Sequence, residues 1–180
     1  MRKLLLISAL LATPAMAQED GPGPNLVIEV AGEASGTVVI DMFEDVAPAH
    51  VEQITTLAEE GAYDNVVFHR VIDGFMAQTG DPTGTGGGGS SYPNLRAEFS
   101  LQPYERGVVG MARTSDPHSA NSQFFIMYAR NSGLNGKYTV WGQVVSGMEH
   151  IDKLRKGVPG SGMVRNPDIM KSLRVAADVK

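Results

Sequence analysis

The sequence has no cysteine, and this absence excludes disulfide bonds, thiol catalysis and thiolate metal ligands. A fold without disulfides depends on its hydrophobic core, and a chain of 180 residues is long enough to bury a substantial one. Apolar runs that could cross a bilayer are also missing. The most apolar run, residues 4–12, falls well short of the roughly 20 residues that a spanning helix needs.

Basic residues are fewer than acidic ones. The chain has 15 Lys and Arg against 20 Asp and Glu, a formal net charge of −5 at pH 7, which gives no reason to expect affinity for nucleic acid or anionic lipid. The four histidines, at positions 50, 69, 118 and 150, are not spaced at i, i+3 or i, i+4, and no carboxylate cluster joins them. The sequence therefore predicts neither a metal site nor a cofactor.

The first residues have the features of a secretory signal peptide. Arg2 and Lys3 precede the apolar run, and Ala15-Met16-Ala17 fits the small-x-small cleavage rule. We expect residues 1–17 to be removed by cleavage after Ala17, residues 18–25 to form a flexible Pro/Gly-rich lead-in, and residues 26–180 to form one domain. The alternative is an N-terminal membrane anchor, which the short apolar run disfavours.

Hydrophobic periodicity predicts many short strands and two isolated helices. One helix is predicted over residues 47–60, with Pro48 in its first turn and Gly61 at its end. The other is predicted from a capping box, Ser146 to Glu149, as far as Gly157. The predicted strands are residues 26–30, 37–43, 66–71, 75–78, 95–99, 108–112, 123–127, 139–144 and 173–179. This order favours an antiparallel barrel or sandwich over alternating βαβ units.

A glycine-rich segment, residues 84–89, satisfies the pattern G-x-G-x-x-G literally. A dinucleotide fingerprint has to open a helix, whereas Ser-Ser-Tyr-Pro follows here, and no Lys-Ser or Lys-Thr follows as a phosphate loop requires. The segment is therefore predicted to be a flexible or tightly turned surface loop. Because a G-x-S-x-G elbow is also absent, hydrolysis by a nucleophile or a metal lacks its parts.

The most informative segment is residues 68–81, FHRVIDGFMAQTGD. Within nine residues it places the guanidinium of Arg70, two large apolar side chains (Phe75 and Met76) and the amide of Gln78 in a stretch with strand character. An apolar floor beside a guanidinium suits an apolar substrate with a backbone carbonyl better than a metal or a nucleotide. A second segment, residues 122–126 (SQFFI), has the same character.

These two segments are joined by further motifs that occur in a fixed order, namely Gly86-x-Gly88-Gly89, Met111-Ala112, Asn121 and Leu134-x-Gly136-x-Tyr138. Together they resemble the cyclophilin family of peptidyl-prolyl isomerases over nearly all of the mature chain. The resemblance implies a mainly β fold, a closed eight-stranded antiparallel β-barrel capped by two helices. It also implies an enzyme that interconverts cis and trans X-Pro bonds without a cofactor.

The implied reaction needs no covalent step. Rotation about a peptide bond costs ~18–20 kcal/mol because resonance is lost, so a catalyst has only to favour the twisted amide over both planar forms. The twisted prolyl nitrogen regains its lone pair, and a fixed donor in a dry site stabilises it. The resemblance implies that Arg70 is this donor, with Phe75 and Gln78 as the other catalytic residues.

The resemblance also implies substrate-binding roles for Met76, Ala112, Arg113, Gln123, Phe125, Leu134 and Tyr138. The apolar members, with Phe75, would receive the proline ring. The glutamines would orient the substrate, and the backbone at positions 112 and 113 would bind the residues before proline. From residue type alone, the apolar side chains would be assigned to the core, and the glutamines could instead satisfy backbone groups.

Three positions depart from patterns common in the family. Gly133 stands where many eukaryotic members have a tryptophan that supports binding of the cyclic peptide cyclosporin, so weak or no cyclosporin binding is expected. Tyr138 replaces a histidine but keeps an aromatic wall with a polar tip. Arg113 replaces an asparagine, and its charge would favour acidic substrate residues.

The sequence thus predicts an exported, monomeric isomerase of the bacterial periplasmic type, in a Gram-negative organism. Its expected partners are proline-containing peptides and unfolded exported proteins, without nucleic acid or a stable membrane anchor. The alternative is a non-catalytic module or periplasmic chaperone that binds Pro-containing segments, and Arg70 favours the enzyme. A carbohydrate-binding barrel is disfavoured because the single tryptophan, Trp141, falls in a strand pattern.

Overall fold

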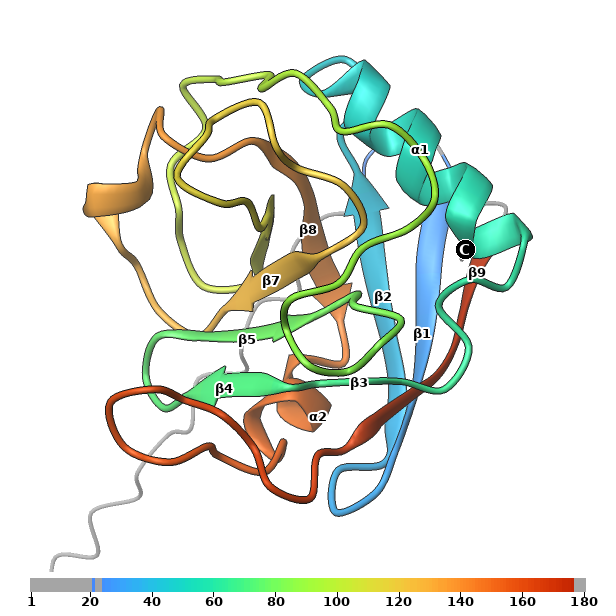
Figure 1. Ribbon diagram of the computed structural model, residues 1–180, viewed down its shortest axis with the longest axis vertical. Helices are drawn as coiled ribbons and strands as arrows, with labels where there is room; N and C mark the ends of the chain where they lie inside the picture. The colour runs from blue at the N-terminus through green and yellow to red at the C-terminus, as the bar shows by residue number, and fades with distance from the viewer. Residues whose placement is uncertain (1–20, 22–23, 177–180) are drawn as a thin grey trace, which may run out of the picture.

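The computed structural model describes residue 21 and residues 24–176 (Figure 1). Within this part of the chain nine strands form one sheet, in the order β3-β9-β1-β2-β8-β6-β7-β5-β4, and all pairs are antiparallel. The strands are β1 (Asn25–Ala31), β2 (Gly36–Met42), β3 (Val66–Val67), β4 (Arg70–Ile72), β5 (Met76–Thr79), β6 (Val108–Met111), β7 (Phe124–Met127), β8 (Val140–Ser146) and β9 (Ile169–Ala176). Two helices, α1 (Pro48–Glu59) and α2 (Met148–Asp152), and a 3-10 turn, η1 (Ser132–Leu134), complete the elements.

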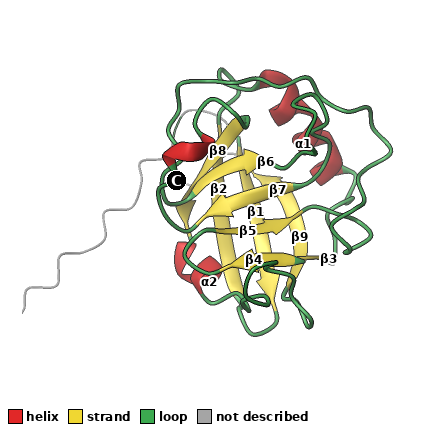
Figure 2. Cartoon of the chain, turned by 60° about the vertical axis from the view of Figure 1, so that its left-hand side comes forward, coloured by secondary structure: helices red, strands yellow, loops and turns green. Residues whose placement is uncertain are grey.

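The sheet curls into a half-barrel (Figure 2). Its two edge strands, β3 and β4, follow each other along the chain with only Phe68 and His69 between them. At these two residues the backbone bonds to a loop instead of a strand: Phe68 N–H donates to the carbonyl of Asp168, and Val164 N–H donates to the carbonyl of His69. In the described residues no ladder joins β3 to β4. The closed, eight-stranded barrel that we expected is therefore not what the structure shows.

Strands β5 to β8 bury both of their faces. In β7, Phe124 and Ile126 face the main core, whereas Phe125 and Met127 face a second cluster on the other side of the sheet. Successive strand side chains point to opposite faces, so the continuous apolar run of β7 reflects cover on both sides. The second cluster consists of Met76, Tyr104, Val108, Phe125, Met127 and Val140.

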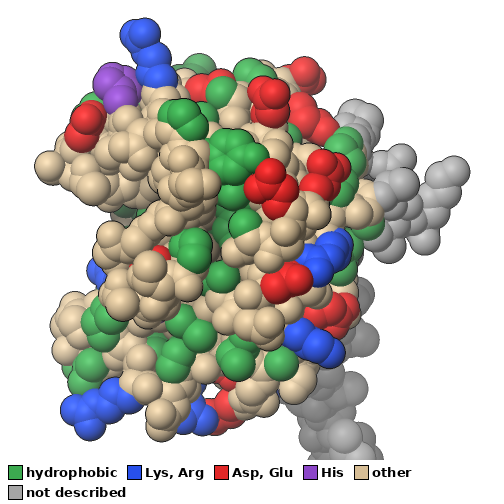
Figure 3. All heavy atoms as spheres, turned by 45° about the vertical axis from the view of Figure 1, so that its right-hand side comes forward, with side chains coloured by type: hydrophobic (Ala, Val, Ile, Leu, Met, Phe, Trp, Pro, Cys, Tyr) green, Lys and Arg blue, Asp and Glu red, His purple; other side chains and the backbone are tan. Residues whose placement is uncertain are grey.

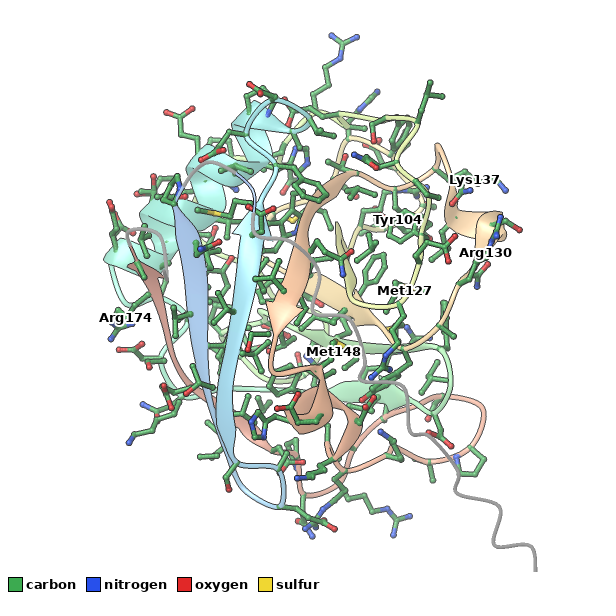
Figure 4. All side chains as sticks on the ribbon, turned by 180° about the vertical axis from the view of Figure 1, so that it is seen from behind. Tyr104, Met127, Arg130, Lys137, Met148 and Arg174 are labelled. Atoms are coloured by element: carbon green, nitrogen blue, oxygen red, sulfur yellow. The ribbon has the colours of Figure 1, made fainter. Side chains whose placement is uncertain are left out.

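Figure 4 shows where the second cluster lies relative to the surface. Tyr104 and Met127 are fully buried inside the molecule, while Arg130 and Lys137 lie exposed at its edge, beside η1. The single tryptophan, Trp141, is fully buried in the main core on β8. It therefore offers no exposed platform for a carbohydrate ring.

Helix α1 lies beside β9, and α2 lies near β2 (Figure 1). Pro48 is the first residue of α1, where its missing N–H costs nothing. Ala47 provides no side-chain cap. The carboxylate of Glu98 instead accepts hydrogen bonds from the N–H groups of Ala49 and His50, each at 3.1 Å. A residue about fifty positions away in sequence thus caps the N-terminus of this helix.

Several element predictions were wrong in detail. Residues 95–99 form no strand, because only Leu95 makes an isolated bridge, to Ala120, and Glu98 serves as the cap of α1. The capping box at α2 is also absent. Ser146 ends β8, Gly147 occupies the N-cap position with φ 87°, and the helix ends at Asp152, before the expected Gly157.

The predicted signal peptide, residues 1–17, lies outside the described residues, as do most of the lead-in and the end of the strand predicted at 173–179. Over the part of the chain that is described, no helix has the length and apolar character that crossing a bilayer requires. On the face shown in Figure 3, basic side chains are interspersed with acidic and apolar ones.

Candidate active site

A pocket of about 210 Å³ opens over the outer surface of the second cluster. Nine of the ten candidate residues line it, namely Arg70, Phe75, Met76, Gln78, Ala112, Arg113, Phe125, Leu134 and Tyr138. The tenth, Gln123, lines an adjoining pocket of about 180 Å³ together with Gly86, Gly87, Gly88, Thr114, Ser119 and Asn121. Gln78, Ala112 and Arg113 line both pockets, which therefore form one continuous site.

Strand register explains why the polar and apolar groups meet. Arg70 on β4 pairs with Gln78 on β5, and Gln78 pairs with Phe125 on β7. Directly opposite residues of antiparallel strands project to the same face. The guanidinium, the amide and the phenyl ring therefore stand in a row on the outer face of the sheet.

The apolar floor of the pocket is also part of the second cluster. Met76 and Phe125 are 2% and 6% exposed, and Phe75 and Leu134 pack against the cluster from its rim. Tyr104 stacks on Phe125 with ring centroids 5.7 Å apart. These apolar side chains are therefore core residues and pocket residues at once, because they fill the second cluster and also face the cavity.

Arg70 is held by neutral acceptors. Its Nε donates to the carbonyl oxygen of Ser161 at 3.0 Å, and its Nη1 donates to Oε1 of Gln78 at 3.3 Å. None of the ion pairs among the described residues involves Arg70. The guanidinium is therefore positioned while its charge stays without a partner carboxylate beside the pocket.

The two glutamines form a chain from Arg70 to the glycine-rich loop. Nε2 of Gln78 donates to Oε1 of Gln123 at 2.8 Å. Nε2 of Gln123 donates to the carbonyl oxygens of Gly86 and Gly88, at 3.1 and 2.8 Å. Gln123 thus satisfies backbone groups, as one of our alternatives stated, whereas Gln78 binds only side chains, and both residues border the site.

The glycine-rich loop is tightly turned around one carboxylate. Asp81 is fully buried, and it accepts hydrogen bonds from the N–H groups of Thr83, Gly86 and Gly88 at 2.8, 2.6 and 3.0 Å. Burial alone would raise the pKa of Asp81, but these backbone bonds and the Thr83 hydroxyl lower the pKa to about 2. Gly86 has φ 86°, a conformation that favours glycine.

Arg113 contributes its side chain as well as its backbone. Its guanidinium lies 4.3 Å from the ring centroid of Tyr138 and donates to the carbonyl oxygens of Lys137 and Thr114. Tyr138 in turn meets Phe125 edge-on, with ring centroids 5.8 Å apart. Arg113 and Tyr138 therefore build one wall of the pocket together.

Sequence reasoning missed three contributors to the site. Ser161 acts through its backbone carbonyl, and nothing in a sequence marks a carbonyl as an arginine acceptor. Tyr104 lies in a segment without strand periodicity, so its place under Phe125 gave no signal. Asp81 lies inside the recognised motif, but nothing in the sequence indicates which groups its carboxylate would bind.

The described residues contain no cluster of three or more His, Asp or Glu side chains that could hold a metal ion.

Comparison with known proteins agrees with this geometry. The family model described as cyclophilin type peptidyl-prolyl cis-trans isomerase/CLD matches residues 26–175. A "probable peptidyl-prolyl cis-trans isomerase" of Brucella suis biovar 1 is 52% identical over 157 residues, covering 81% of this chain and 80% of the relative. "Peptidyl-prolyl cis-trans isomerase-like 1" of Aspergillus fumigatus is 43% identical over 123 residues, covering 66% of this chain and 76% of the relative.

Solved structures give the same result. The chain resembles a Cryptosporidium parvum cyclophilin type peptidyl-prolyl cis-trans isomerase, crystallised in the presence of the dipeptide Ala-Pro, with a TM-score of 0.78 and 31% identity. The match covers 86% of this chain and 99% of that one. A cyclophilin of Hirschia baltica matches with a TM-score of 0.76 and 27% identity, covering 91% and 77% of the two chains. On the extent of these matches, the chain belongs to the cyclophilin-type peptidyl-prolyl cis-trans isomerase family.

Proposed function

We propose that this pocket receives the proline ring of an X-Pro segment and that Arg70 stabilises the twisted amide. One observation carries the proposal: a guanidinium without a partner carboxylate is fixed at the rim of a buried apolar floor. A proline ring is apolar, and the amide that it belongs to is polar. The pocket presents a complementary surface to each part.

In the proposed mechanism the side chains of Phe75, Met76, Phe125 and Leu134 contact the pyrrolidine ring. Arg70 holds the carbonyl of the residue before proline and donates toward the prolyl nitrogen when that nitrogen becomes pyramidal. The planar isomers have no such lone pair, so this donor favours the twisted state over both. Arginine keeps its charge at any working pH, which suits a reaction without net proton transfer.

The size of the proposed effect follows from the uncatalysed reaction. X-Pro isomers differ by only about 0.5–1 kcal/mol but exchange over tens to hundreds of seconds. Loss of one fixed donor in a dry site typically costs roughly 10²–10³ in rate, or about 3–4 kcal/mol. Arg70 is the residue that we propose supplies this stabilisation, with Gln78, Gln123 and the backbone at Ala112 and Arg113 orienting the substrate.

We further propose that the enzyme acts on exported proteins in the periplasm of a Gram-negative bacterium. The positive charges, the apolar run and Ala15-Met16-Ala17 at the start of the sequence support this location. Amino-terminal sequencing of the protein from a periplasmic extract should read from Gln18. An intact Met1 on membrane-bound protein would contradict the proposal. We propose a monomer, with unfolded Pro-containing segments as its substrates.

The competing function is binding without turnover, as in a chaperone that grips Pro-containing segments. The Arg70→Ala variant separates the two, because it removes the donor and leaves the apolar floor. For an isomerase, the variant should still bind a short Pro peptide in calorimetry and should fail to support folding of a Pro-limited exported client. If client folding is preserved while turnover is lost, binding is the function.

A further inference from the structure

The hydrogen bonds around Gln123 have a fixed direction. Its amide has two N–H groups, and both are used by loop carbonyls, those of Gly86 and Gly88. Its Oε1 is therefore the end that faces Gln78, and it accepts a hydrogen bond from Nε2 of Gln78. This leaves Oε1 of Gln78 facing Nη1 of Arg70.

Reversal of either amide would be unfavourable. A reversed Gln123 would bring its oxygen against two carbonyl oxygens, and it would present N–H groups to Gln78. A reversed Gln78 would then present N–H groups to the guanidinium, so that donors would face donors. The loop carbonyls thus determine which end of each amide faces Arg70.

Asp81 is what fixes these carbonyls. It binds the N–H groups of Gly86 and Gly88, the two residues whose carbonyls bind Gln123. Both residues are therefore held from both of their polar groups. Asp81 itself is fully buried and lines neither pocket, so it acts from outside the substrate site.

We propose that Asp81 is a positioning residue for the isomerase reaction. It holds the loop carbonyls, the carbonyls orient Gln123 and Gln78, and Gln78 fixes the guanidinium of Arg70. The proposal rests on the role proposed above for Arg70. It implies that loss of Asp81 lowers kcat, because the donor loses its position, while KM changes little, because the apolar floor is untouched.

The test compares two buried carboxylates. Asp81→Asn keeps the size of the side chain but replaces one acceptor oxygen by an NH2 group. Because Oδ1 accepts from the N–H of Thr83 and Oδ2 accepts from those of Gly86 and Gly88, either orientation of the amide sets its NH2 group against a loop N–H. The control is Asp168→Asn. Asp168 is 3% exposed, accepts hydrogen bonds from the N–H groups of Ala34 and Arg155, and lines neither pocket. The kcat and KM of both variants are measured on an Ala-Pro peptide after circular dichroism has verified the fold.

We expect Asp81→Asn to lower kcat by about tenfold or more with KM within about twofold, because small misplacements of a catalytic group are costly. Asp168→Asn should keep kcat within about twofold of wild type. Unchanged kcat in Asp81→Asn, or equal losses in both variants, would overturn the proposal. If Asp81→Asn fails to fold, Thr83→Val, which removes only the hydroxyl bound to Asp81, replaces it with the same expectations in direction.

A double-mutant cycle tests the route of the effect. If Asp81 acts through Arg70, then Asp81→Asn should change the residual rate of Arg70→Ala by less than about twofold. A full additional loss would show a different route and overturn the inference. The two proposals fail separately. If Arg70→Ala keeps the wild-type rate, the function proposed for Arg70 is refuted. If Arg70→Ala loses its activity while Asp81→Asn keeps the wild-type rate, only the positioning role of Asp81 is refuted.

Discussion

Arg70 differs from Arg106 and Arg174 in the partners that it has. Arg106 and Arg174 bind carboxylates, Asp152 and Asp64, through two oxygens each. Arg70 binds a carbonyl and an amide instead. Neutral acceptors fix the direction of a guanidinium without neutralising its charge. The motif around position 70 identified the residue, but its partner at position 161 is 91 residues away in the chain and lay beyond any local pattern.

The charge of Arg113 should influence which peptides are preferred. The guanidinium is tied to two carbonyls and stacks on Tyr138, so it is fixed at the boundary of the two pockets. We expect an Ala-Pro peptide with Glu before the Ala-Pro unit to be turned over faster than the matched peptide with Lys, by about threefold at low salt. The ratio should approach one in high salt. Equal kcat/KM for both peptides at low salt would refute the preference.

Cyclosporin should bind weakly or not at all. The position before Leu134 is Gly133, whose N–H donates to Oδ1 of Asn131, the N-cap of η1. A glycine places no aromatic ring over the pocket there. Isothermal titration of the purified protein measures the affinity for cyclosporin, and the Gly133→Trp variant, which restores the aromatic side chain, is expected to bind cyclosporin more tightly. A submicromolar dissociation constant for the wild type would contradict the expectation, whereas tighter binding by Gly133→Trp would agree with it.

Among the elements, those with local signals were predicted best. Helix α1 has Pro48 in its first turn as expected, although it begins one residue after the predicted start at position 47, because proline is favoured at the first helical position. Its cap, Glu98, could not be predicted, because the side chain reaches the helix through tertiary contact. The same contact explains the wrong strand at residues 95–99. At α2, the pattern from Ser146 to Glu149 matches a capping box. However, β8 pairs with β2 as far as Ser146, so Ser146 is a strand residue and Gly147 is the N-cap of the helix.

The glycine-rich loop allows a matched pair of stability tests. A Cβ added at Gly88 would contact Oδ1 of Asp81 and crowd Thr83, whereas one at Gly87 would meet only the hydroxyl of Thr85, at 3.7 Å. Neither glycine has a positive φ, so backbone strain is not involved. We expect Gly88→Ala to lower the free energy of unfolding by about 1–3 kcal/mol and Gly87→Ala to change it by less than about 0.5 kcal/mol. Urea denaturation measures both, and equal effects would refute the packing account.

For the molecule as a whole, the curled sheet separates two apolar clusters, and the site lies on the outer one. Sequence patterns predicted strands from runs such as FFIM in β7, but they could not say which side of each strand would face the cavity. That assignment follows from the register that sets Arg70, Gln78 and Phe125 in one row. The open edge between β3 and β4 was also beyond prediction, since it depends on loop carbonyls and N–H groups at positions 164 and 168.

Acid should destabilise the fold in two stages. Burial lowers the pKa of His50 and of His69 below the usual 6.5, with Glu98 and Asp81 partly offsetting it. Both imidazoles stay neutral in the fold while the unfolded chain takes up protons, so stability falls as pH drops below 6.5. Asp81, unlike the histidines, is charged when it is deprotonated. Its pKa of about 2 lies below the usual 3.8, so its stabilisation is present above pH 3.8 and is lost as pH falls toward 2.

Urea unfolding at a series of pH values between 8 and 3 measures this dependence. We expect a lower free energy of unfolding at pH 5 than at pH 8, and a further fall below pH 4 that is smaller in Asp81→Asn. Equal stability at pH 8 and pH 5 would contradict the neutral state of the two buried histidines.

Catalysis as proposed depends above all on Arg70, the donor that would accelerate X-Pro rotation. The most direct measurement is the cis-to-trans relaxation rate of a short Ala-Pro peptide, with the mature wild-type protein and with its Arg70→Ala variant. We expect strong acceleration by the wild type and a loss of roughly 10²–10³-fold in kcat/KM in the variant. Equal acceleration by both proteins would contradict the role of Arg70, and no acceleration by folded wild-type protein would contradict catalysis at this pocket.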